Sequence, residues 1–272
     1  MTMLHSRTTG SGHRVAVLLG ALGSSADMWA PLQDALSGTG DADLPRLTAL
    51  ELRGHGASPM PPVPPRSAGH RDSSPTTVSD LAGDVLTTLD GLGIDHADIV
   101  GLSIGGAVAQ YLAARHSDRV TTLTLMCTAP VFGEPSDWTT RATAVRARGT
   151  DTLRELAETT VQRWLTGEFR RTRPGTALSV EEMISRTTPS GYAACCDALS
   201  TFDGRDLLGD ITAPTLTLAA TWDRTCPPSV LEQMNAAVGN PVRHVELPAA
   251  HLLPVELPGQ VADVLRDFWA GA

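Results

Sequence analysis

The segment Gly101-Leu102-Ser103-Ile104-Gly105-Gly106 constrains the fold of this chain more than any other feature, because of what flanks it. A short apolar strand pattern precedes it at residues 97–100, and good helix formers follow it at residues 107–115. A serine on a tight turn between a strand and a helix, with a glycine two residues away on each side, is typical of a nucleophile elbow. We expect strained backbone angles at Ser103, and the N–H groups that begin the helix can hold an oxyanion.

Apolar strands alternate with helical segments on both sides of this turn. We predict strands at residues 15–19, 47–52, 97–102, 120–127, 214–220 and 242–247, and helices at 26–36, 77–92, 107–115, 228–238 and 258–269. Such alternation predicts the α/β class, with a mostly parallel central sheet flanked by helices. Residues 58–76 are rich in proline and small polar residues, which indicates an exposed loop.

The alternation stops at about residue 131. From there to residue 206 the pattern is helical and contains no convincing strand. We therefore predict a core of residues 1–130 and 207–272 and a helical cap of residues 131–206. The insertion follows the carboxyl end of a strand, where open α/β sheets bind ligands, so we expect the cap to cover the site.

Composition excludes several function classes. The 272 residues carry a net charge of −9, which argues against nucleic acid or an anionic membrane as partner. All 21 basic residues are arginine, which excludes Schiff-base chemistry and a Walker-type phosphate loop. The four cysteines lack zinc-ligand spacing and indicate thiols in a reducing cytoplasm. No apolar run reaches the ~18 residues of a membrane span, and the polar N-terminus does not resemble a signal peptide.

A serine nucleophile needs a base, and the base needs a carboxylate to orient it. In this arrangement the chain order is serine, acid, histidine, and only His244 and His251 lie beyond both the elbow and the cap. His251 follows the last strand in a loop, from which it can reach Ser103, whereas His244 falls inside that strand. We predict His251 as the base and assign His55, which precedes the elbow, a packing role.

Asp223 follows the strand at 215–220, on the edge of the sheet that also carries the elbow. We predict it as the orienting acid, with Asp203 and Asp206 as weaker alternatives. The oxyanion needs two backbone donors, for which we predict the N–H groups of Ile104 and Leu22.

The chain resembles the α/β-hydrolase family, and within it the 3-oxoadipate enol-lactonases. General resemblance lies in the segments 52–58 (Leu-Arg-Gly-His-Gly-Ala-Ser), 101–106 and 250–252 (Ala-His-Leu). The closer resemblance lies in 22–29, 123–138, 141–146, 163–164 and 191–199. Two departures are Gly20, where many relatives carry a polar side chain, and a longer loop around residues 65–74.

This resemblance implies a serine hydrolase that opens a small enol-lactone through an acyl-enzyme on Ser103, without metal or organic cofactor. A substrate carboxylate calls for an arginine. The cap offers several binding candidates, of which the sequence singles out none as the anchor: Trp138, Arg141, Arg146, Arg163 and Trp164. The partner is then a small lactone or ester, and the chain is compatible with either a monomer or a homo-oligomer.

Three other functions remain open. One is a different ester, lactone or thioester hydrolase on the same scaffold, because cap residues can diverge. Another is cofactor-free perhydrolysis or carbon–carbon bond hydrolysis by the same three residues. The third is a ligand receptor with little turnover, which failure of a phosphonate probe to label Ser103 would favour.

Overall fold

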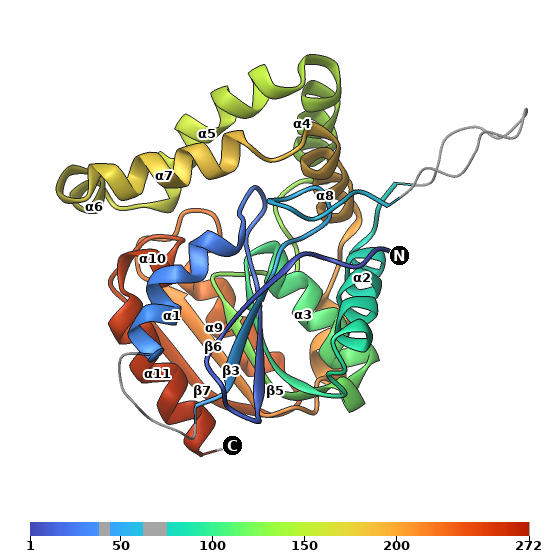
Figure 1. Cartoon of the computed structure of the whole chain (residues 1–272), viewed down its shortest axis with the longest axis vertical. Helices are drawn as coiled ribbons and strands as arrows, with labels where there is room; N and C mark the ends of the chain where they lie inside the picture. The colour runs from blue at the N-terminus through green and yellow to red at the C-terminus, as the bar shows by residue number, and fades with distance from the viewer. Residues whose placement is uncertain (38–43, 62–74, 272) are drawn as a thin grey trace, which may run out of the picture.

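The computed structural model describes residues 1–37, 44–61 and 75–271 of the chain. Within them the strands form one seven-stranded sheet (Figure 1). Its order is β1 (Ser6–Thr9), β3 (Arg46–Leu50), β2 (Val15–Leu19), β4 (Ala97–Leu102), β5 (Val120–Met126), β6 (Thr215–Ala220) and β7 (Pro241–Leu247). β1 pairs antiparallel with β3, and all other neighbours are parallel. The carboxyl ends of the parallel strands therefore meet at one edge, where the elbow begins.

The interior strands are buried on both faces, as expected for a parallel sheet covered by helices. Every residue of β2, β4 and β6 is buried. Side chains alternate between two apolar clusters: Val17 and Leu19 belong to one, Ala16 and Leu18 to the other. β7 lies at the edge, and most of its residues are exposed or half-buried.

Helices complete the two clusters. One contains residues of α2 (Val78–Gly91), α3 (Ile104–Arg115) and α9 (Pro228–Ala237). The other contains residues of α1 (Ala30–Ser37), α10 (Leu253–Glu256) and α11 (Pro258–Ala270). Local signals set the ends: Thr77 caps α2 by accepting from the backbone N–H of Asp80 at 3.2 Å, while the Asp80 carboxylate accepts from the Thr77 N–H at 2.8 Å.

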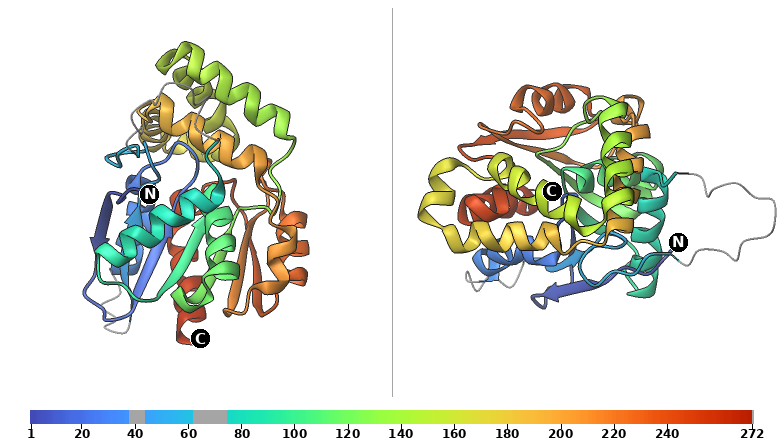
Figure 2. Two further views of the ribbon diagram at one scale, coloured as in Figure 1. Left: turned by 90° about the vertical axis from the view of Figure 1, so that its right-hand side faces the viewer. Right: turned by 90° about the horizontal axis from the view of Figure 1, so that it is seen from above.

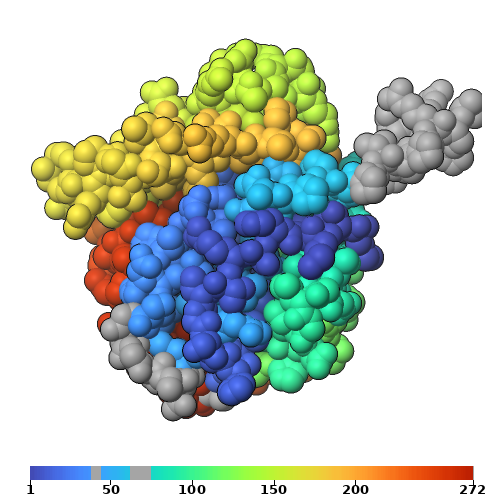
Figure 3. Space-filling view, viewed as in Figure 1, coloured from blue at the N-terminus to red at the C-terminus, as the bar shows by residue number. Residues whose placement is uncertain are grey.

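Five helices, which we call the cap helices, lie between β5 and β6 in the chain. They are α4 (Pro135–Arg148), α5 (Thr150–Trp164), α6 (Gly167–Thr172), α7 (Pro174–Ser185) and α8 (Pro189–Thr201). They form a separate layer above the sheet (Figure 2), and the α6–α7 end extends beyond the body of the molecule (Figure 3). Their apolar residues join the core clusters, Val145 and Leu199 one and Val161 and Ile184 the other. The predicted helical insertion is confirmed, while its bounds at 131 and 206 stay a prediction.

Most predicted elements, including the strand at 214–220, are confirmed to within one or two residues. The helix predicted at 107–115 begins three residues earlier, at Ile104. The predicted helix at 26–36 differs, because a 3₁₀ turn, η1 (Ala26–Trp29), precedes α1. Pro31 has no N–H to bond four residues back, so a continuous α-helix is not favoured there. The sequence did not indicate β1, α10, or the 3₁₀ turns η2 (Ser117–Arg119) and η3 (Arg205–Asp210).

Part of the predicted loop at 58–76, namely residues 62–74, lies outside the described residues, as does the long segment at 65–74. Among the described helices, none has the length and apolar character needed to cross a bilayer.

Candidate active site

Ser103 lies on the predicted turn between β4 and α3. Its backbone has φ 59° and ψ −122°, in the left-handed region that non-glycine residues seldom occupy. A Cβ at Gly101 would lie 2.4 Å from the carbonyl oxygen of Gly105, and a Cβ at Gly105 would lie 2.1 Å from that of Leu19. Both glycines are therefore required by close backbone approach, and the predicted strain at Ser103 is confirmed.

His251 and Asp223 form a buried pair at the same edge of the sheet. His251 Nδ1 lies 2.7 Å from Asp223 Oδ2, and neither side chain is exposed. The other carboxylate oxygen accepts from the N–H groups of Thr225 at 2.7 Å and Cys226 at 3.0 Å. Because an ionised carboxylate only accepts, Nδ1 carries the proton and Nε2 keeps a lone pair.

His251 Nε2 is buried and has no hydrogen-bond partner among the described residues. The indole of Trp164 packs against the imidazole, with ring centroids 5.6 Å apart. Ser103, 7% exposed, is tied to the end of β5 because its N–H donates to the carbonyl of Met126 at 3.1 Å. The free lone pair of Nε2 is the feature that a general base requires.

Cys127, directly after β5, lies against this pair and was not predicted. Its Sγ, the Asp223 carboxylate and a His251 ring nitrogen all lie within 4.8 Å of one another. Burial, with the charge of Asp223, raises the pKa of the Cys127 thiol well above its usual value. Among the described residues this is the one set of His, Cys, Asp and Glu side chains whose atoms could reach a shared metal ion. The raised thiol pKa and the hydrogen bond between His251 and Asp223 both oppose metal binding there.

The two predicted oxyanion donors lie on adjacent segments. Gly105 N–H donates to the carbonyl of Gly20 at 3.1 Å, which ties the turn after β2 to the elbow. Within the described residues, the N–H groups of Leu22 and Ile104 have no hydrogen-bond partner. A Cβ at Gly20 would lie 2.5 Å from Ser24 Oγ, so the Ser24 side chain occupies the space that a side chain at position 20 would need.

A small cavity of about 140 Å³ lies over Ser103, between the core and the cap helices. Four of the five predicted binding residues line it, together with Leu22. The lining residues are Leu22, Ser103, Phe132, Trp138, Arg141, Thr160, Arg163, Trp164, Tyr192, Leu199, Arg224 and Thr225.

Three arginines, Arg141, Arg163 and Arg224, line this cavity, and the first two lie on the cap helices. Arg141 Cζ lies 4.8 Å from the ring centroid of Trp138, whose Nε1 donates to the carbonyl of Phe132. Burial and the neighbouring charge of Arg141 lower the pKa of Arg163. Within the described residues, neither Arg141 nor Arg163 pairs with a carboxylate.

Arg146 does not share this position. It is not among the residues that line the cavity, and its Nη1 donates to Asp197 Oδ1 at 3.1 Å. That hydrogen bond raises the pKa of Arg146. Since its charge already has a carboxylate partner, we remove it from the predicted binding residues.

The alternative catalytic residues lie elsewhere. Asp203 is exposed, and its hydrogen bond with Arg205 lowers its pKa to about 2. Asp206 is also exposed.

The two other histidines considered for the base have partners of their own. His244 Nδ1 lies 2.8 Å from Thr217 Oγ1. His55 is fully buried, its Nδ1 lies 3.0 Å from the Arg53 carbonyl oxygen, and burial lowers its pKa to about 4.

Comparison with known proteins identifies the family. A family model described as alpha/beta hydrolase fold matches residues 15–257. The chain belongs to the alpha/beta hydrolase family. It is similar to 3-oxoadipate enol-lactonase 2 of Acinetobacter baylyi, with 31% identity over 221 residues that cover 81% of this chain and 76% of the relative.

Two solved structures extend the similarity of this hydrolase over nearly its whole length. The enol-lactonase from Burkholderia xenovorans superposes with a TM-score of 0.86 at 32% identity, over 98% of this chain and 96% of that one. A thermophilic esterase from Thermogutta terrifontis, with malate bound, gives a TM-score of 0.85 at 26% identity, over 98% and 93% of the two chains. The chain is thus an alpha/beta hydrolase that resembles the enol-lactonases.

Several residues that line the cavity of this hydrolase escaped prediction. Arg224 and Thr225 directly follow Asp223, so their position beside the predicted acid was a usable signal. Burial raises the pKa of Tyr192 to about 12, so its phenol stays protonated. Thr160 is 5% exposed, and its Oγ1 has no partner within the described residues; nothing in its sequence context points to the cavity.

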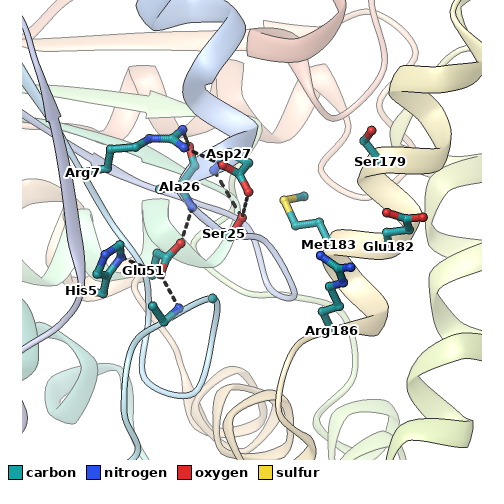
Figure 4. Close-up of a pocket in the computed structure, with 12 residues that line it drawn as sticks. His5, Arg7, Ser25, Ala26, Asp27, Glu51, Ser179, Glu182, Met183 and Arg186 are labelled. Atoms are coloured by element: carbon teal, nitrogen blue, oxygen red, sulfur yellow. Dashed lines mark hydrogen bonds and ion pairs between the residues drawn. The ribbon is translucent and has the colours of Figure 1, made fainter.

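A larger cavity of about 670 Å³ lies between α7 and the N-terminal part of the hydrolase core (Figure 4). The charged side chains on its core side already have partners within the protein. The Glu51 carboxylate accepts from the N–H groups of Ala26 at 2.9 Å and Ala57 at 2.7 Å, and Arg7 pairs with Asp27 at 2.5 Å. No predicted site residue lines it, so we assign it no role in the chemistry.

Proposed function

We propose that this hydrolase opens a small enol-lactone that carries a carboxylate, converting 3-oxoadipate enol-lactone to 3-oxoadipate. The observation that carries the proposal is the presence of Arg141 and Arg163, neither paired with a carboxylate of the described residues, in the cavity that contains Ser103. Two neighbouring guanidiniums repel each other, and an anionic substrate relieves that repulsion. The similarity to enol-lactonases supports the same substrate class.

In the proposed acylation step, Ser103 Oγ attacks the lactone carbonyl carbon while His251 Nε2 takes the hydroxyl proton. Asp223 holds Nδ1–H and stabilises the imidazolium that forms. The Leu22 and Ile104 N–H groups stabilise the oxyanion. The ring C–O bond then breaks, the enol oxygen receives the proton from Nε2, and the enol relaxes to a ketone.

Deacylation repeats the chemistry with water. His251 Nε2 takes a proton from a water molecule, whose oxygen attacks the ester carbonyl of the acyl-enzyme. Collapse of the second tetrahedral intermediate returns the proton to Ser103 Oγ and releases the 3-oxo acid. The step needs no metal or organic cofactor, since the three side chains and two backbone donors supply every proton transfer and charge contact.

The cavity residues act in this proposal as selectors. Trp138 orients Arg141, Trp164 packs on His251, and the small volume limits the part of the substrate that lies over Ser103. We retain the cap at residues 131–206 as the proposed substrate-selecting unit. Because all four cysteines are buried and unpaired, we also retain the reducing cytoplasm as the proposed location.

The test is the loss of ultraviolet absorbance of 3-oxoadipate enol-lactone with wild type and Ser103→Ala in parallel. We expect kcat/KM above about 10⁴ M⁻¹s⁻¹ for wild type and a loss of at least about 10³-fold in the variant. If wild type leaves the lactone intact but hydrolyses p-nitrophenyl acetate through Ser103, the enzyme is an esterase for another substrate. If neither ester is cleaved and a fluorophosphonate does not label Ser103, the proposed chemistry is wrong.

A further inference from the structure

A second cavity, of about 560 Å³, lies immediately outside the one over Ser103. It is formed by the end of α5, by α6, and by the loops that follow β6 and β7. Arg163 and Arg224 line both cavities, so they lie at the boundary between them. Arg170 and Trp222 line only the outer one. A molecule that extends from Ser103 past this boundary enters a region with a different charge from the rest of the protein.

The outer cavity is strongly cationic. Within the described residues, none of Arg163, Arg170 and Arg224 forms an ion pair with a carboxylate. In the part of the chain that the structure describes, the Arg170 guanidinium makes one hydrogen bond, a long one of 3.4 Å from Nε to the carbonyl of Leu165. The chain as a whole has 30 acidic and 21 basic residues, so three unpaired arginines around one cavity run against its overall charge.

The nearby carboxylates do not neutralise this cavity. Glu158 and Glu181 line a separate pocket that Arg170 also borders, but within the described residues neither forms an ion pair with it, and neither lines the outer cavity. Asp223 is the one acidic residue that lines the outer cavity, and it is buried against His251. The Glu256 carboxylate accepts hydrogen bonds from the backbone N–H of Thr166 at 2.7 Å and from the Thr166 hydroxyl at 3.0 Å. Glu256 does not line the cavity. The charges of the three arginines therefore remain available to a ligand.

Trp222 adds an apolar surface beside these charges. It is 55% exposed, although most large apolar side chains of this protein are buried. The backbone N–H of Trp222 donates to the carbonyl of Ala249 at 2.9 Å, which fixes the loop that carries the ring. An exposed indole beside three guanidiniums offers stacking or apolar contact next to an anion site.

We infer that the outer cavity is an anion subsite for a carboxylate or phosphate on the part of a substrate that projects beyond the cavity over Ser103. The inference rests on the proposed function in one respect, namely that the ester of the same molecule lies at Ser103. It extends the substrate class from small lactones to esters or lactones with a second, distal anionic group. Arg170 and Arg224 contact that group, and Trp222 packs against the carbon chain or ring that carries it.

The test is isothermal titration of wild type with two probes, phenyl phosphate and 3-phenylpropionate, at low and high NaCl. We expect at least one probe to bind with a dissociation constant in the millimolar range or below, more weakly as NaCl screens the charges. Arg170→Gln should raise that constant about five- to tenfold, since it removes one charged contact. The probe that binds tells a phosphate site from a carboxylate site.

Arg171→Gln is the matched control, because Arg171 is exposed on the same helix and lines neither cavity. Its dissociation constant should stay within about twofold of wild type. The inference is overturned if neither probe binds, if the two variants respond alike, or if Arg141→Gln abolishes binding while Arg170→Gln leaves it unchanged.

Hydrolysis of p-nitrophenyl acetate by each variant separates this inference from the proposed function. Arg170 does not line the cavity over Ser103, so Arg170→Gln should hydrolyse this neutral ester at the wild-type rate. If hydrolysis does not depend on Ser103 although Arg170 governs anion binding, the proposed function fails and the subsite stands. If hydrolysis depends on Ser103 and the anions do not bind, only the subsite fails.

Discussion

The lower and upper walls of the cavity over Ser103 differ in how their charges are satisfied. On the core side, Asp223 accepts three hydrogen bonds from the protein itself, one of them from His251. On the side of the cap helices, Arg141 and Arg163 have no carboxylate partner among the described residues and repel each other. In the proposed function the core side therefore serves ester chemistry in general, whereas the cap side selects a particular anion.

The largest loss of activity should come from a substitution on the core side of the cavity. Asp223→Asn removes the acceptor that holds the Nδ1–H of His251, so the imidazole is no longer kept in the tautomer with a free Nε2. We expect kcat on p-nitrophenyl acetate to fall about 10³- to 10⁴-fold. Circular dichroism should show a folded protein. A loss below about tenfold would mean that another group orients the base.

Substitutions on the cap side should weaken turnover of an anionic substrate while leaving hydrolysis of a neutral ester intact. Arg141→Gln or Arg163→Gln removes a charged contact to the substrate carboxylate, so KM for the anionic lactone should rise about ten- to a hundredfold. Kinetics on neutral p-nitrophenyl acetate should change little. Arg146→Gln is the control, because that residue pairs with Asp197 outside the cavity and should leave both substrates unaffected.

Thr160→Val sharpens the comparison, since it replaces a hydroxyl by a methyl group of similar size. The buried Oγ1 lacks a partner within the described residues, so its removal should raise the free energy of unfolding by about 1 kcal/mol in urea titrations. KM for a lactone with polar oxygens should rise a few-fold if that hydroxyl bonds the substrate. Unchanged KM with the same gain in stability would assign Thr160 to packing alone.

The smallest effect concerns Cys127, whose Sγ lies within 4.8 Å of the Asp223 carboxylate and of a His251 ring nitrogen. Cys127→Ala should lower kcat two- to fivefold, because it removes a weak S–H donor beside Asp223, and Cys127→Ser should retain most of it. Since burial and Asp223 raise the thiol pKa well above its usual value, iodoacetamide at pH 8 should leave the native residue unmodified. Rapid alkylation with loss of activity would show a reactive thiolate instead.

The same contrast explains what could be predicted from the sequence. Ser103 and its flanking glycines follow from local backbone geometry, and Asp223 and His251 follow from their places after strands of a parallel sheet. Arg146 could not be told from Arg141 by pattern, because both lie on α4 and only the contact with Asp197 distinguishes them. Thr160 and Arg170 could not be predicted as cavity residues, because their positions depend on how α5 and α6 pack against the rest of the protein.

The hydrogen bond from Gly105 to Gly20 also bears on how the enzyme acquires activity as it folds. The predicted oxyanion donors, Leu22 and Ile104, follow strands β2 and β4, which pair in register with Leu19 opposite Gly101. Because each donor closely follows one of these strands, we expect neither to reach its position until that long-range pairing has formed. Recovery of esterase activity during refolding should therefore lag behind helix formation and coincide with protection of the central amides from hydrogen exchange, which makes turnover a reporter of the completed sheet.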